Sequence, residues 1–340
     1  MKYKNKLLCG LLVATILISG CSAAQDKDFA QNIEIEEVAD TDASAEGTDQ
    51  SSVEDSSSKS DEETSDDSNA GNSGTSADSA GDGDHSTVAD YDYDYTEDIK
   101  ADVEAVVEAS SSLQEELSNI PTITDKYEDL FSDAETQFEM NVAAGWYHEI
   151  WDAELNNIWK RFTDLADEET KQRVLADQRN WIGMTEEVVA EDLGPREEGG
   201  SIYPLERSAY LEEATEYRCY VIANELAQLK GEEFTMPERS TKYGTFVDNQ
   251  GTGSVYGILI TRPGWEKGSE EAIISAYRVG EVTGSFVENS DGTLLFTSDD
   301  ENVKGIITID WQNGATFKVT EVTGDSIFHP DEIYEFPFVF

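Results

Sequence analysis

Residues 31–90 form an acidic, low-complexity stretch that limits where this chain can fold. They consist mainly of Ser, Asp, Glu, Gly, Ala and Thr, with a single lysine at position 59 and almost no large apolar side chain. Such a segment cannot bury enough apolar surface to offset the entropy lost on ordering. We therefore expect a disordered, self-repelling tether here, with the folded structure confined to the residues that follow.

The same stretch supplies much of the chain's formal charge of −50 at pH 7. We interpret this acidity as a solvated spacer, and the alternative is a surface for a specific basic partner or for cations. Nucleic acid is excluded as a partner class, because binding to phosphates requires clustered lysines and arginines.

The N-terminus has the pattern of a bacterial lipoprotein signal. Several lysines in the first six residues precede an apolar run over 7–18, which ends in Ser19, Gly20 and Cys21. The run suits a signal peptide but is too short for a transmembrane helix. The pattern predicts that Cys21 receives a diacylglycerol and becomes the mature N-terminus after removal of residues 1–20. An ordinary secretory signal with an incidental cysteine is the alternative.

Lipidation at Cys21 implies that the protein is anchored to the cell membrane on its extracytoplasmic face. Two acyl chains, palmitate among them, would attach the protein firmly to the membrane, whereas a single chain would not.

The remaining cysteine and histidine pattern does not indicate a metal site. Cys219 alone is left once Cys9 and Cys21 are accounted for, and a buried small side chain is its simplest role, with a reactive or dimerising thiol as the alternative. His85, His148 and His329 are far apart in the sequence. We expect no transition metal and no cofactor.

Apolar residues recur at helical spacing from Thr96 to about residue 230. The pattern predicts a first helix that Pro121 ends and a second that a Thr136/Glu139 capping box begins, followed by helices over about 168–191 and 204–230. Gly231 is placed as the C-cap of the last helix. The tryptophans are expected in the core where helices cross, and a carbohydrate-stacking platform is the alternative.

After Pro237 the pattern changes to short alternating segments. We predict strands over 243–247, 254–261, 272–279, 282–288, 293–298, 304–310, 315–321 and 332–338, with turns at Asn313-Gly314 and Asn289–Gly292. About eight such strands favour a small antiparallel β-barrel, because closure removes exposed edges. The predicted fold class is α+β and multidomain: signal 1–20, acidic linker 21–95, helical bundle 96–232 and barrel 238–340.

A recognisable set of motifs lies over about residues 130–230. The motifs are Thr136-Gln137-Phe138-Glu139-Met140-Asn141, Asp152-Ala153-Glu154-Leu155-Asn156, Gln178-Arg179-Asn180-Trp181-Ile182, Gly199-Gly200-Ser201 with Pro204, and Thr215 with Arg218. Their order and spacing resemble those of the LprI-like lysozyme inhibitor family. Family members usually carry cysteines that join these helices. Here Val142 and Tyr210 stand where such cysteines are expected, and Cys219 does not restore a pair.

The resemblance implies a helical module that inhibits lysozyme, with lysozyme or another basic envelope-active protein as the partner. The following barrel is similar in size and order to MliC-like or lipocalin-like barrels. MliC inhibitors place a hydroxyl and a cation against the enzyme's carboxylates, so Ser298 and Lys304 are the candidate loop contacts, although the turn between them is acidic. A strongly acidic chain would be steered toward basic lysozymes.

The polar motif residues are candidates for a structural or binding network: Asp152, Asn156, Gln178, Arg179, Trp181 and Arg218. We expect Asp152 and Arg179 to form a charged clamp between helices, with Arg218 joining them. A polar pocket for a ligand is the alternative.

Binding is favoured over catalysis. Acidic pairs such as Glu149 and Asp152 are common by chance in so acidic a chain, and no nucleophile motif is present. We therefore expect a non-enzyme. The main alternative to an inhibitor is an envelope scaffold that binds peptidoglycan, another glycan or a protein.

Overall fold

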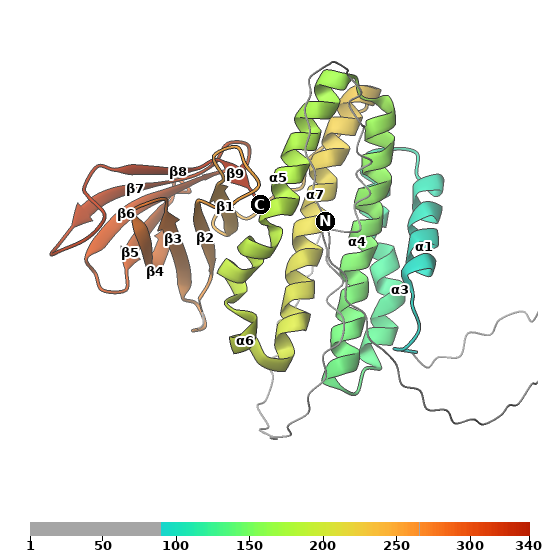
Figure 1. Cartoon of the computed structure of the whole chain (residues 1–340), viewed down its shortest axis with the longest axis horizontal. Helices are drawn as coiled ribbons and strands as arrows, with labels where there is room; N and C mark the ends of the chain where they lie inside the picture. The colour runs from blue at the N-terminus through green and yellow to red at the C-terminus, as the bar shows by residue number, and fades with distance from the viewer. Residues whose placement is uncertain (1–89, 265) are drawn as a thin grey trace, which may run out of the picture. The chain divides into compact units, whose positions relative to one another are not determined.

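The computed structural model describes residues 90–264 and 266–340. The predicted signal peptide, Cys21 and the acidic tether lie outside these residues. The described part consists of a helical region followed in the chain by an antiparallel sheet (Figure 1), which confirms the predicted α+β class.

The helical region runs from residue 96 to residue 230. Its elements are α1 (Thr96–Ala109), α2 (Leu113–Asn119), α3 (Pro121–Ser132), α4 (Gln137–Leu165), α5 (Glu168–Leu193), α6 (Arg196–Gly199), the 3₁₀ turn η2 (Gly200–Ile202) and α7 (Tyr203–Lys230).

The first predicted helix is wrong in its extent. The Ser110-Ser111-Ser112 run interrupts it, since Ser112 accepts a hydrogen bond from the Glu115 backbone and caps a new helix, α2. Pro121 does not end the segment but occupies the first turn of α3. Proline is tolerated there because its missing N–H would have no partner within the helix.

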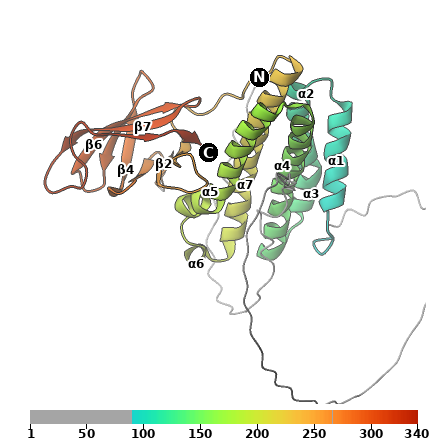
Figure 2. The same ribbon diagram turned by 45° about the horizontal axis from the view of Figure 1, so that its top comes forward.

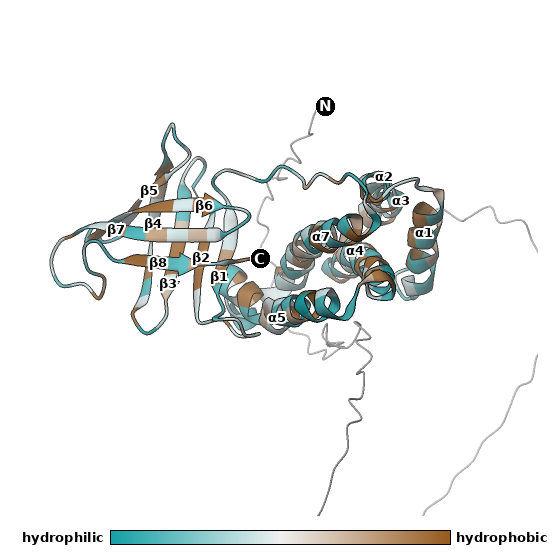
Figure 3. Ribbon diagram, turned by 90° about the horizontal axis from the view of Figure 1, so that it is seen from above, coloured by the Kyte–Doolittle hydropathy of each residue, from teal (hydrophilic) through white to brown (hydrophobic). Residues whose placement is uncertain are grey.

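The long helices α4 and α7 lie side by side and form the centre of the helical region (Figure 3), with α1 and α3 on the other side of α4 (Figure 2). The predicted Thr136/Glu139 capping box begins α4, and Gly231 in the left-handed region ends α7. The tryptophans of the helices are buried, as expected for core residues: Trp146, Trp151, Trp159 and Trp181.

The sheet has nine strands, each antiparallel to its neighbours. They are β1 (Gly244–Asp248), β2 (Gly257–Pro263), β3 (Glu270–Ala276), β4 (Gly280–Glu288), β5 (Leu294–Ser298), β6 (Val303–Asp310), β7 (Gly314–Val322), β8 (Ile333–Phe336) and β9 (Phe338–Val339).

The C-terminal segment makes the sheet nearly close into a barrel. β8 pairs with β7, and β9 pairs with β1 through Phe246–Val339 and Val247–Phe338. The sequence predicted one strand over 332–338, whereas the structure divides this segment at Pro337. Proline cannot donate to a strand ladder, so the pairing changes partners at that residue.

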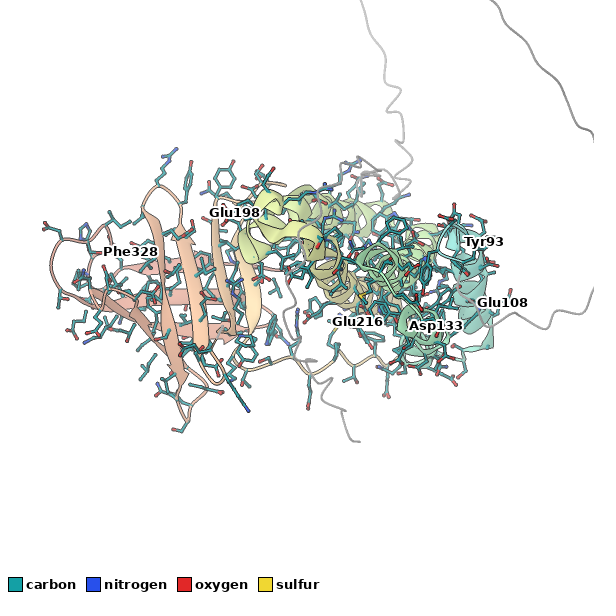
Figure 4. The ribbon with its side chains drawn as sticks, turned by 90° about the horizontal axis from the view of Figure 1, so that it is seen from below. Tyr93, Glu108, Asp133, Glu198, Glu216 and Phe328 are labelled. Carbon is teal, nitrogen blue, oxygen red and sulfur yellow. The ribbon has the colours of Figure 1, made fainter. Side chains whose placement is uncertain are left out.

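Aromatic side chains fill the interior of the barrel. Phe317 is fully buried and makes edge contacts with Phe296 and Phe328 at 5.4 and 6.3 Å between ring centroids. Figure 4 labels Phe328, which is 1% exposed. Burial alternates along β5 and β6, as the sequence alternation predicted, whereas consecutive residues of β1 and β2 are buried.

The turn at Asn313-Gly314 is longer than predicted. Residues 311–313 connect β6 to β7, and Gly314 is already the first residue of β7, paired with Asp310. Its φ of 93° is one that glycine adopts readily.

Candidate functional site

Three residues of the predicted network, Gln178, Trp181 and Arg218, meet where α5 and α7 pack. Arg218 on α7 is 4% exposed and donates hydrogen bonds to Gln178 Oε1 at 2.6 Å and to Asp177 Oδ2 at 2.7 Å. Its guanidinium also lies 5.8 Å from the centre of the Trp181 ring. Arg218 therefore keeps its charge in the core through several fixed partners.

The predicted clamp between Asp152 and Arg179 does not form. Arg179 is exposed on α5, and no ion pair joins it to Asp152 in the part of the chain that the structure describes. Asp152 instead accepts a hydrogen bond from Asn156 Nδ2 at 3.1 Å, one turn along α4. Gln178 and Arg179 are adjacent on α5 and lie about 100° apart around the helix, and here Gln178 faces α7 while Arg179 is exposed. Asn156 and Gln178 thus belong to separate pairs rather than to one network.

Burial changes the acidity of Asp152. Loss of hydration raises the pKa of its carboxyl to about 6, and the Asn156 hydrogen bond and the more distant Lys100 oppose this shift.

A second buried cluster was missed in the sequence. Arg161 on α4 donates to both carboxylate oxygens of Glu116 on α2, with Nη1 at 3.0 Å from Oε2. Glu154, also on α4, is fully buried and lies 4.0 Å from the same guanidinium. Burial, then the hydrogen bond and the charge of Glu116, raise the pKa of Glu154 well above its usual value.

Burial therefore favours the protonated form of the Glu154 carboxyl. The signal that could have found it is its position between Trp151 and Leu155, on the buried stripe of α4 where an acid is out of place.

Cys219 is fully buried, and its thiol donates to the Trp151 carbonyl at 3.3 Å. Burial raises the pKa of this thiol well above its usual range. The expectation of a small core side chain is met, and the thiol is neither exposed nor activated as a nucleophile.

The candidate barrel contacts do not form an inhibitory loop. Ser298 is 3% exposed and is used within the β5–β6 turn, where its hydroxyl donates to Asp300 Oδ1 at 2.6 Å and accepts from the Val303 backbone. Lys304 is half-exposed but pairs with Glu321 at 3.2 Å on the neighbouring strand. Ser298 cannot reach a partner, because its side chain stabilises the turn from inside.

Two features are absent from residues 90–264 and 266–340. No cluster of three or more His, Cys, Asp or Glu side chains is arranged to hold a metal ion there. Within the same residues, no helix combines the length and apolar character needed to cross a bilayer.

The helices that carry the polar pairs lie in a segment of the sequence that matches the model of a known family. Residues 131–222 match the family model of the lysozyme inhibitor LprI. The LprI segment, as we call residues 131–222, begins at the end of α3 and includes α4, α5, α6, η2 and most of α7. It contains both Arg218 and Glu154 together with their α4 and α5 partners. No curated protein and no solved structure matched the chain.

The LprI segment is stabilised here without a disulfide bond. Cys219 is free, and Val142 and Tyr210 occupy positions where the resemblance noted in the sequence led us to expect cysteines. Packing of α4 against α7 and the Arg218–Asp177 ion pair between α7 and α5 connect the helices of the segment, and the Arg161–Glu116 ion pair joins α4 to α2 outside it.

Proposed function

We propose that this protein is a lipid-anchored surface protein that binds lysozyme and blocks its action on the cell envelope. The observation that carries the proposal is the LprI match over residues 131–222, the region that forms the core of the helical bundle. A family of inhibitors acts by binding rather than by catalysis, in keeping with the buried, paired state of the polar motif residues.

Charge complementarity supports a basic enzyme as the partner. The chain has a formal charge of −50 and a calculated isoelectric point near 4.1. Opposite net charges accelerate encounter between proteins, and salt weakens this effect. A basic lysozyme would therefore associate quickly with this chain at low ionic strength.

We infer that this protein does not inhibit lysozyme as MliC inhibitors do, by inserting a hydroxyl and a cation into the enzyme cleft. Ser298 is buried, Lys304 is paired with Glu321, and the turn between them carries Asp299 and Asp300. The carboxylates of an enzyme cleft would repel Asp299 and Asp300. We assign inhibition to an acidic surface that covers the basic enzyme, not to a projecting cation.

The test is hydrolysis of labelled cell wall by a panel of basic lysozymes, titrated with the full chain purified in detergent from its native membrane. We expect stoichiometric inhibition, with association slowed at high salt. Unchanged hydrolysis by every lysozyme, together with sedimentation of the protein with the cell wall, would instead identify an envelope scaffold.

A further inference from the structure

A cavity opens at the seam of the barrel, where the sheet does not fully close. Its volume is about 380 Å³, and it is lined by the end of β1, the end of β3 and the β8 segment: Asp248, Ala276, Tyr277, Ile333, Tyr334, Glu335, Phe336 and Pro337. We call these residues the seam pocket.

The chain connectivity explains why the pocket lies there. β9 pairs with β1 only at Phe246 and Val247, so Asp248 is paired with Gly257 on β2 but with no residue of β9. β8 is hydrogen-bonded to β7 on one side and is an edge strand of the sheet. The change of partner at Pro337 thus leaves a gap between Asp248 and β8 that side chains only partly fill.

The lining combines aromatic rings with carboxylates. Tyr277 and Ile333 are 37% and 57% exposed, so both side chains are accessible to a partner. Asp248 and Glu335 supply negative charge, and no lysine or arginine belongs to the lining. An aromatic ring beside a carboxylate is the environment that attracts an ammonium or guanidinium group.

A cation–π contact is already present at the rim of the seam pocket. The exposed Arg278 guanidinium lies 4.7 Å from the centre of the Tyr277 ring. Tyr277 also packs edge-on against Tyr256 at 5.0 Å, which holds its ring in place. The ring is thus fixed and already attracts one cation.

We propose that the seam pocket receives a lysine or arginine side chain from the surface of a basic partner protein. The Tyr277 ring and Ile333 would cover the aliphatic stem, and Asp248 and Glu335 would pair with the charged end. This inference deepens the proposed function, since it identifies the barrel surface on which a basic lysozyme would be held. The inhibitor would then accept a cation from the enzyme instead of inserting one into it.

The first experiment needs no lysozyme. The full chain in detergent, with isotope-labelled tyrosine and isoleucine, is titrated with Nα-acetyl-lysinamide and followed by NMR. The neutral Nα,Nε-diacetyl-lysinamide and N,N′-diacetylchitobiose serve as comparison ligands. We expect the lysine amide alone to shift the Tyr277, Tyr334 and Ile333 signals. A response to the chitobiose alone, an equal response to the neutral amide, or no response would overturn the proposal.

The second experiment uses a lysozyme that the parent protein binds. The Asp248→Asn/Glu335→Gln variant keeps hydrogen-bonding atoms but removes the pocket's charge, and we expect affinity about tenfold weaker or more. Glu281→Gln/Glu104→Gln, which removes the same charge from exposed sites outside the pocket, is the matched control. Equal affinities of the two variants would reject the pocket but leave the proposed function intact. Absence of any lysozyme binding would reject the proposed function, and the NMR titration would still decide on the pocket.

Discussion

The helical core buries ionisable side chains and stabilises them in different ways. Arg218 keeps its charge because Gln178 and Asp177 accept its hydrogen bonds. Burial and Glu116 raise the pKa of Glu154, which favours the protonated form of its carboxyl. A cation with fixed partners and a protonated acid are both compatible with a low-dielectric interior.

Replacement of Arg218 tests the first arrangement. Arg218→Ala leaves the buried Gln178 amide without its partner, so we expect the free energy of unfolding to fall by roughly 1–3 kcal/mol. Arg179→Ala, on the exposed side of the same region, is the control and should change it by less than about 0.5 kcal/mol. Thermal unfolding followed by helical circular dichroism measures both. A larger loss for Arg179→Ala would restore the clamp that the sequence predicted.

The raised pKa of the Asp152 carboxyl predicts a specific pH dependence of the free energy of unfolding. Its pKa is raised to about 6 in the folded protein, so the folded state holds a proton that the unfolded state releases from about pH 4 upward. The contribution of Asp152 to stability is therefore complete below about pH 4 and is lost as pH rises through 6. Asp152→Asn still accepts the Asn156 hydrogen bond and has no proton to lose.

We expect Asp152→Asn to be more stable than the parent at pH 7, with the difference disappearing below about pH 4. Urea unfolding at intervals between these values provides the measurement. Parallel stability curves for the two proteins would show that Asp152 titrates normally.

At the scale of elements, the barrel depends on hairpins whose glycines have positive φ. Gly314 at the start of β7 has a φ of 93°, and a Cβ there would lie 2.1 Å from the Phe336 carbonyl oxygen of β8. Gly292 before β5 has a φ of 84° and open space around it. The two positions share backbone strain but differ in packing, so they form a matched pair.

Alanine substitution should separate these effects. Gly292→Ala should lower the free energy of unfolding of the barrel by about 1–2 kcal/mol through backbone strain alone. Gly314→Ala should lower it by about 1–3 kcal/mol more, because β8 must move away from β7. Thermal unfolding followed by near-ultraviolet circular dichroism would measure both. Equal losses would mean that β8 adjusts without a penalty and that the seam is more deformable than the structure indicates.

At the scale of the whole molecule, the proposed arrangement is a lipid anchor, an acidic tether and folded domains held away from the membrane. The tether predicted over residues 31–90 would keep a negatively charged protein from lying flat on an anionic surface. Distance from the membrane would suit a protein that intercepts an enzyme before it reaches the envelope.

The anchor is tested by Cys21→Ala. We expect this variant to be released from the membrane fraction or to persist as a precursor without lipid, since no thiol is available for the diacylglycerol. Fractionation with mass spectrometry of the N-terminal peptide measures the outcome, and Cys219→Ala is the control that leaves the signal intact. Membrane retention of Cys21→Ala at the parent level would contradict a lipid anchor.

Local sequence patterns determined the order and type of the elements. The Thr136/Glu139 capping box, Gly231 and the alternating segments after Pro237 each depend on neighbouring residues, so they were visible without a tertiary structure. The LprI resemblance also came from motif spacing alone, and the family match covers nearly the same residues. The break at Ser110 was missed because helical periodicity continues through it.

Only the tertiary structure decided which polar groups meet. Periodicity shows which face of a helix is buried, but the relative register of α4, α5 and α7 selects Arg218 over Arg179 as the buried cation. The burial of Ser298 and the gap beside Pro337 likewise depend on how strands distant in sequence pair around the barrel. The local patterns specified the elements of this protein, and long-range packing specified its surfaces, because contact between distant residues requires that both elements are already positioned.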